Sequence, residues 1–377
     1  MKTLLECEFE YVANPHLMQI YAGFFELHKK GIIRLKARPV GKATSGPHIL
    51  VVTINKKYKV AYDALDGFSW IIGDKEQNLS YFQNNFKVDF YFKRSFHQQL
   101  YQYKPANCHI FPLGLNYNVY PDYNMLAYNP TLKDKLKYVL KTNRLFNRVS
   151  SKNFFYAKDF EHHPTNHSVD RILFITRAWD PQEARWEGAR PHREMVNQMR
   201  AECIRLCRKE FGDRFTGGLS TDAYSTKHFA DLIIPNEYTG KSRFLQAVKE
   251  HSICIATTGL HDSIGWKLGE YVAASRAIVS EPLHYEVPGN FKKDQNYLAF
   301  ETPAQLIEQI QKLLDNKELI LQMMQNNHQY YTDYVKPDKL VLNTLLQVLQ
   351  HIERHPSVIH TNDSQVVAYN GIEYAKS

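Results

Sequence analysis

The sequence predicts an α/β protein made of two layered domains, and three observations indicate this. The chain has 377 residues, which is enough for about two domains of common size. Short β-branched runs alternate with segments of helical spacing along most of it, as in layered α/β folds. Residues 252–280 form a strand–loop–helix–strand unit with polar residues after its first strand, where ligands of open α/β sheets bind. We therefore expect two Rossmann-like, doubly wound domains.

The first domain is expected to span residues 1–165. Alternating and β-branched runs predict its strands, and apolar residues three and four apart predict its helices. A loop is expected at residues 41–47, and an irregular segment at 116–167 with one helix near 132–141. The expected strands are 1–12, 32–40, 48–54, 59–63, 87–94 and 108–111, and the expected helices are 16–30 and 96–103.

The second domain is expected to span residues 166–336, and a last helix and a polar tail fill residues 337–377. A single apolar stripe predicts the helix at 191–211. Thr302 and Gln305 form a capping box around Pro303, which predicts the start of another helix. The expected strands are 171–176, 214–216, 252–258, 277–280 and 296–300, and the expected helices are 191–211, 241–251, 304–314, 317–335 and 339–354.

Composition narrows the classes of function. No apolar run reaches the roughly 18 residues that span a bilayer, and acids near the N-terminus argue against an export signal. Five cysteines without paired spacing fit a reducing compartment, so we expect a cytoplasmic protein. The net charge of +8 favours anionic partners such as phosphorylated substrates, lipid headgroups or nucleic acid. No basic-aromatic motif supports nucleic acid, so we expect none.

Cationic residues gather where strands of the second domain end and helices begin. Arg177 follows one strand, and Lys241 and Arg243 open a helix after Gly240. The loop 259–265 leads into a helix N-terminus, whose free N–H groups and dipole suit a phosphate. Together these features outline a nucleotide diphosphate site. The competing interpretation is an ordinary crossover helix among solvated charges.

Candidates for the chemistry on the opposite side come from the first domain. Asp63, Asp66 and His97 lie at or after strand ends and could act as a general base. Asp63 and Asp66 could equally be turn residues before Gly67. Two cations at the end of a strand, Lys93 and Arg94, could touch phosphate or acceptor or could simply cap the sheet.

Residues 262–279 resemble the donor-site motif of GT-B glycosyltransferases. That motif has an acid, seven residues, a Glu, a helix of small residues and a β-branched strand, and here Asp262 and Glu270 keep the spacing. Asp262 stands in place of the usual Glu, Ser275 where Gly is common and Ala277 where Pro is common. The resemblance covers residues 170–350 and is closest to bacterial transferases of surface glycans, including exostosin-like ones.

The resemblance implies two domains facing a central cleft, with a last helix that returns to the first domain. It also implies that Glu270 binds the donor ribose, that the loop 259–265 faces the diphosphate and that Arg177 binds phosphate. The partner lysine of these enzymes has no match, so Arg185, Arg190 or Arg193 would replace it. The expected donor-binding residues are Arg177, Arg185, Arg193, Lys241, Arg243, Gly259, His261, Asp262, Ser263, Ile264, Gly265, Lys267 and Glu270.

We therefore expect a glycosyltransferase that moves a sugar from a UDP- or GDP-linked donor to a surface polysaccharide, glycoconjugate or glycolipid. The chain has no Asp-X-Asp motif, and the resemblance implies an enzyme without metal or cofactor. A peripheral contact with the inner membrane face is an additional option. Two alternatives stay open: a nucleotide-sugar epimerase on the same fold, and a catalytically silent binding protein.

Overall fold

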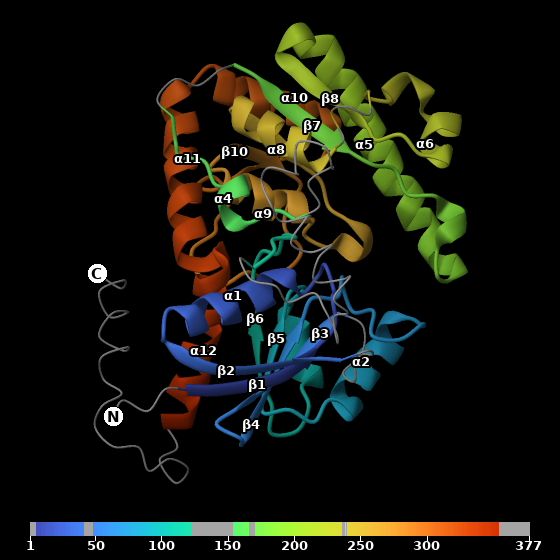
Figure 1. Cartoon of the computed structure of the whole chain (residues 1–377). Coiled ribbons are helices and arrows are strands. Elements are labelled where there is room, and N and C mark those ends of the chain that lie inside the picture. Colours follow the sequence, from blue (N-terminus) through green and yellow to red (C-terminus); the bar gives the residue numbers. More distant parts are fainter. Residues whose placement is uncertain are drawn as a thin grey trace, which may run out of the picture.

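The computed structural model describes residues 5–40, 48–121, 154–165, 170–235, 238 and 240–353. Two β-sheets, each with helices against it, form two lobes stacked on one another (Figure 1). This confirms the predicted α/β class. We call the lobe of the first sheet the N-terminal lobe and that of the second sheet the C-terminal lobe.

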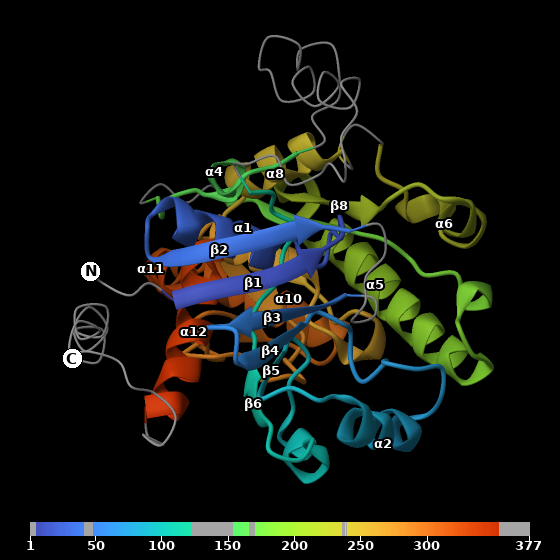
Figure 2. The same ribbon diagram turned by 60° about the horizontal axis from the view of Figure 1, so that its bottom comes forward.

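The N-terminal sheet has six strands in the order β2-β1-β3-β4-β5-β6 (Figure 2). Strands β1 and β2 are parallel, as are β4, β5 and β6, whereas β3 runs antiparallel to β1 and to β4. A tight turn with Asn55 and Lys56 at positive φ joins β3 to β4, as hairpins require. The sheet is therefore mixed. Its strands are β1 (Leu5–Tyr11), β2 (Ile33–Pro39), β3 (Ile49–Ile54), β4 (Tyr58–Asp63), β5 (Phe90–Lys93) and β6 (His109–Pro112).

Three helical segments of the first 121 residues and the last described helix cover this sheet. They are α1 (Met18–Lys29), α2 (Lys75–Asn85), the 3₁₀ segment η1 (Gln98–Tyr103) and α12 (Pro337–Glu353). Helix α12 packs against α1 so closely that a Cβ on Gly23 would lie 2.2 Å from the carbonyl oxygen of Pro337. Tyr62 on β4 also hydrogen-bonds Thr344 at 2.8 Å. The last helix thus completes the core of the N-terminal lobe (Figure 1).

The C-terminal sheet is entirely parallel, in the order β11-β10-β9-β7-β8. Strand β7 comes first in sequence and has β8 on one side and β9 on the other, so the topological switch point lies between β7 and β9. This is where doubly wound sheets bind ligands. The strands are β7 (Ile172–Thr176), β8 (Phe215–Leu219), β9 (Ile253–Ala256), β10 (Ala277–Ser280) and β11 (Leu298–Ala299).

Helices lie on both faces of the C-terminal sheet. The long helix α5 buries Cys203, Ile204 and Cys207 of the predicted apolar stripe in the core, whereas Met195 at its start is exposed. Thr302 accepts a hydrogen bond from the backbone N–H of Gln305 and caps α10 as predicted. The helices are α4 (Ala157–Phe160), α5 (Arg190–Phe211), α6 (Ala223–His228), α8 (Lys241–Glu250), α9 (Trp266–Ala273), α10 (Pro303–Leu314), α11 (Lys317–Tyr330) and the π-helical η8 (Tyr331–Val335).

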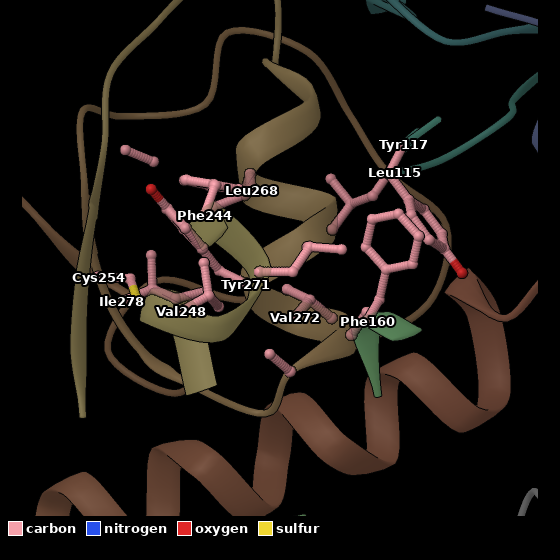
Figure 3. Close-up of a cluster of buried hydrophobic side chains, with 14 of the residues drawn as sticks. Leu115, Tyr117, Phe160, Phe244, Val248, Cys254, Leu268, Tyr271, Val272 and Ile278 are labelled. Atoms are coloured by element: carbon pink, nitrogen blue, oxygen red, sulfur yellow. The ribbon is translucent and has the colours of Figure 1, made fainter. Parts of the chain in front are cut away.

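A buried apolar cluster that includes Leu268, Tyr271 and Val272 of α9 joins the two lobes (Figure 3). Leu115 and Tyr117, which follow β6, pack there with Phe160 of α4 and with side chains of α9. Gly269 lets this segment approach, since a Cβ there would lie 2.8 Å from the carbonyl oxygen of Asn116. The helix that begins at the predicted phosphate loop is thereby fixed against the N-terminal lobe.

Several elements differ from expectation. Helix α2 was not predicted, the segment 98–103 is 3₁₀ rather than α-helical, and the strand expected at 296–300 shortens to β11. The loop 41–47, the helix near 132–141 and the polar tail lie outside the described residues. Among the described residues, no helix is long and apolar enough to cross a membrane.

Candidate nucleotide-binding cleft

Two adjoining cavities lie between the lobes. The first cavity, of 420 Å³, sits at the carboxyl ends of β7 and β9, the switch point of the C-terminal sheet. It is lined by residues 174–177 and 255–260, by the start of α9, and by His16, Asp66 and Arg94 of the N-terminal lobe. The second cavity, of 740 Å³, lies between residues 65–75 and residues 185–193. His16, Asp66, Arg177, Trp179, Leu260 and Asp262 line both.

The loop between β9 and α9 is folded tightly onto itself. The N–H of Gly259 donates to the carbonyl of Ser263 at 2.8 Å, and His261 and Asp262 adopt positive φ. Gly265 precedes α9, and no side chain caps this helix. A Cβ on Gly265 would meet nothing within 4 Å, and residues 265–268 at the start of α9 line the first cavity. Such a terminus is suited to an anion.

A buried carboxylate of the same helix also lines the first cavity. Glu270 is 2% exposed and accepts a hydrogen bond from Lys241 Nζ at the start of α8. Lys267 lies over the ring of Phe244, with Nζ 4.0 Å from the ring centroid. Burial lowers the pKa of Lys267 to about 8, although Glu270 opposes this shift. The first cavity is thus lined by the buried carboxylate of Glu270, by Lys241, which is hydrogen-bonded to it, and by Lys267.

Arg200, in the middle of α5, ties the two strands of the switch point together. Its guanidinium donates to the carbonyl oxygens of Arg177 at 2.7 Å and Thr258 at 2.9 Å, and to the hydroxyl of Thr257 at 3.0 Å. Burial lowers the pKa of Arg200 to about 10, while the carboxylate of Glu281 opposes the shift. The three bonds fix the spacing between the residues that follow β7 and β9.

Arginine and tryptophan side chains stack at the boundary of the two cavities. The guanidinium of Arg177 lies 3.6 Å from the ring centroid of Trp179, and that of Arg193 lies 5.8 Å from it. Asp262 pairs with His192 Nε2 at 3.1 Å, which anchors the loop 259–265 to α5. This boundary presents cations to both cavities.

The N-terminal lobe closes the first cavity with a histidine and an ion pair. The ring of His16 lies 4.1 Å from that of His48 and 4.8 Å from that of Trp266, and its buried Nδ1 has no hydrogen-bond partner. Burial lowers the pKa of His16 to about 4, with His48 and Arg94 adding to the effect. Arg94, itself buried, pairs with the half-open carboxylate of Asp66.

The candidate Asp63 has a structural role. It is fully buried and lies 3.3 Å from Lys93 Nζ, and it accepts hydrogen bonds from Trp70 at 2.8 Å and Tyr91 at 2.5 Å. It is absent from the lining of both cavities. A carboxylate held by so many partners is not free to take a proton from a substrate, which corrects its proposed use as a base.

Most of the remaining predicted residues line one or both cavities. His97 reaches only the second cavity, where its Nδ1 accepts from the N–H of Gln99. Arg243 lines neither cavity and lies near Tyr238. The first cavity receives Asp66, Arg177, Lys241, Gly259, Asp262, Ser263, Ile264, Gly265, Lys267 and Glu270, and the second receives Asp66, His97, Arg177, Arg185, Arg193, His261 and Asp262.

Among the lining residues of the first cavity that sequence reasoning missed are His16, Trp179 and Arg200. A lone histidine after Asn14-Pro15 and an arginine inside an amphipathic helix carry no motif. Their contacts come from residues far along the chain, so only the tertiary structure reveals them. Among the described residues, no group of three or more His, Cys, Asp or Glu side chains could hold a metal ion.

No protein-family model matches the sequence, and no curated protein does either. Solved structures show a loose likeness. Anabaena HepE in complex with UDP and glucose has a TM-score of 0.43 at 9% identity, covering 91% of this chain and 98% of that one. A putative UDP-N-acetylglucosamine 2-epimerase from Listeria monocytogenes has a TM-score of 0.40 at 13% identity, covering 93% and 98%.

The pneumococcal O-GlcNAc transferase GtfA in complex with UDP and GlcNAc has a TM-score of 0.39 at 10% identity, covering 72% of this chain. This chain spans only 46% of GtfA. At this level of similarity, the reactions of these proteins cannot be assigned to the present chain. Its chemistry has to be argued from its own residues.

Proposed function

We propose that this protein transfers a sugar from a nucleotide-diphosphate donor to a glycan acceptor. One observation carries the proposal: the first cavity brings Arg177, Lys241 and the open N-terminus of α9 together around the buried carboxylate of Glu270. N–H groups and cations complement a diphosphate. A carboxylate beside them accepts hydrogen bonds from ribose hydroxyls, as acids do in dinucleotide sites.

The same groups suit the reaction. When an acceptor oxygen attacks the anomeric carbon, the bond from that carbon to the diphosphate oxygen breaks and negative charge grows on the leaving diphosphate. Preorganised cations and N–H groups stabilise that charge more than they stabilise the donor. In this proposal Arg177, Lys241 and α9 supply this stabilisation.

The acceptor proton needs a base from the opposite wall. His16 and Asp66 are the described groups that line both cavities from the N-terminal lobe and can accept a proton. His16 is neutral at pH 7 because its pKa is lowered to about 4, and its Nδ1 is unpartnered. Asp66 is held by Arg94. The proposal assigns the acceptor-facing role to this wall.

Titration calorimetry with UDP and GDP tests the donor assignment. We expect one of the two to bind, and we expect Glu270→Gln to weaken it at least tenfold, because a hydrogen bond to a charged group contributes about 1.5–3 kcal/mol. The matched control is Glu250→Gln, an exposed acid on α8. If neither nucleotide binds, or Glu270→Gln binds like the wild type, the assignment is wrong. Incubation of UDP- or GDP-sugars without acceptor then separates transfer from epimerisation, which needs no second substrate.

A further inference from the structure

We propose that the second cavity is an acceptor subsite that takes an acidic oligosaccharide. Its role as an acceptor site rests on the function proposed above, but the chemistry of the cavity is argued independently. Its volume of 740 Å³ falls in the range of about 300–1,000 Å³ typical of small-molecule sites. Because it shares His16, Asp66 and Arg177 with the first cavity, a molecule bound in it would present a hydroxyl at the donor.

The charge of the second cavity favours an anion. Its acids already have partners: Asp66 pairs with Arg94, Asp262 with His192, and Asp74 caps α2 through the N–H of Gln77. Its cations Arg185, Arg177 and Lys75 form no ion pair with an acidic side chain in the described part of the chain. Uncompensated cations in a concave site concentrate the field and attract anionic ligands.

Apolar surface in the same cavity favours a ring-bearing ligand. Trp186 is 43% exposed, and Ile72 on the facing loop is 75% exposed. The indole lies directly on the backbone, because a Cβ on Gly188 would be 2.2 Å from Trp186 Cζ3. A flat aromatic face beside a free guanidinium is suited to the apolar face of a sugar ring whose substituent is charged. The cavity therefore combines a stacking platform with an anion site.

Two pairs of probes test this inference by calorimetry: trigalacturonate against maltotriose, and glucose 6-phosphate against glucose. We expect the charged member of at least one pair to bind at least tenfold more tightly at 50 mM NaCl, and the gap to shrink at 500 mM because salt screens the attraction. The pair with the larger gap shows whether the acceptor charge is a carboxylate or a phosphate.

Variants locate the site. Arg185→Gln should weaken the charged probe about tenfold and leave the neutral probe unchanged. Gly188→Ala should weaken both, since the added Cβ displaces the indole. Arg214→Gln, an exposed arginine next to the amino end of β8, removes the same charge elsewhere and should change nothing. Equal binding of charged and neutral probes, or equal effects of the two arginine variants, would overturn the inference.

Two further measurements distinguish this inference from a membrane-binding surface and from the proposed sugar transfer. Binding to vesicles of anionic lipid without binding to either charged probe would overturn it in favour of a membrane surface. UDP and GDP affinities are measured on the same variants and should not change, because Arg185 and Gly188 line only the second cavity. If neither nucleotide binds while trigalacturonate binds through Arg185, the proposed transfer is wrong and the anionic glycan site stands. If a nucleotide binds while neither charged probe does, only the glycan site is wrong.

Discussion

Lys241 Nζ donates a hydrogen bond to the buried carboxylate of Glu270, so the first residue of α8 is tied to the middle of α9 across the wall of the first cavity. Half of this pair is open to solvent, since the side chain of Lys241 is 32% exposed and that of Glu270 is 3% exposed. The lysine side chain is therefore accessible to a ligand, whereas the carboxylate is held in a buried position.

Lys241→Met should destabilise the protein by roughly 1–3 kcal/mol, because it leaves a buried carboxylate without its hydrogen-bonded cation. Urea unfolding measures this. The double variant Lys241→Met with Glu270→Gln should recover part of the loss, since the remaining amide carries no charge. Lys209→Met, at an exposed position of α5, is the control and should change stability by less than about 0.5 kcal/mol. A double variant as unstable as the sum of both single variants would contradict the coupling.

Arg200→Lys should weaken UDP or GDP binding and lower stability by about 2–3 kcal/mol, because an ammonium cannot replace a fork that reaches three acceptors. The matched variant is Arg205→Lys on the same helix, where an exposed arginine pairs with Asp231. An exposed pair of this kind contributes about 0–1 kcal/mol. Thermal unfolding with and without nucleotide measures both effects. Equal losses of stability in the two variants would show that the three hydrogen bonds of Arg200 contribute no more than an exposed ion pair.

Gly67→Ala should destabilise the contact between the lobes. Gly67 has a φ of +55°, and an added Cβ would lie 2.5 Å from the Cβ of His261. Gly31→Ala is the control, because Gly31 has a φ of +70° but nothing within 4 Å. The control isolates backbone strain of about 1 kcal/mol, and the difference between the two unfolding free energies measures the clash. Equal losses would show that the lobes do not press together at this point.

Stability should fall as the pH drops from 7 toward 4. The pKa of His16 is lowered from 6.5 to about 4 in the folded protein, so between these values the unfolded chain binds more protons than the folded one. Stability contributed by neutral His16 is present above pH 6.5 and is lost progressively toward pH 4, by at most about 3 kcal/mol and less for a partly exposed ring. Burial lowers the pKa of His48 and His261 in the same direction.

Urea unfolding at several pH values checks this dependence. His16→Asn should reduce the slope between pH 7 and pH 4.5, because one of the rings whose pKa is lowered by burial is gone, while His48, His162, His251, His261 and His328 remain. An unchanged slope would mean that His16 is not the group whose protonation opposes folding.

The order of the strands and of the longer helices in the C-terminal lobe could be predicted because these elements have strong local patterns, whereas the short helices α4 and α6 were not predicted. Most of the apolar stripe of α5 is buried, and Thr302 caps α10, although the side chain of Gln305 accepts its hydrogen bond from the N–H of Glu301 instead of completing the predicted capping box. Residues 262–270 kept the loop and the helix that the motif predicts. Parallel strands that are buried on both faces appear in the sequence as continuous apolar runs, so their positions along the chain are easy to predict.

Other features depend on contacts that no local pattern encodes. Helix α2 has a polar composition, and its only signal was the capping box of Asp74 and Gln77. The antiparallel placement of β3 is a matter of topology rather than of strand propensity. Asp63 and Asp66 look alike in sequence, yet one is buried under Lys93 and the other opens to the cavities. Burial after folding, rather than residue type, separates a structural acid from one that can meet a substrate.

Gln19 on α1 bonds both segments by which the chain passes between the lobes. Its amide nitrogen donates to the carbonyl oxygens of Val335 at 2.7 Å and Leu115 at 3.3 Å. One side chain of α1 is therefore hydrogen-bonded to both crossings, so any change in the distance between these two segments would break at least one of the two bonds.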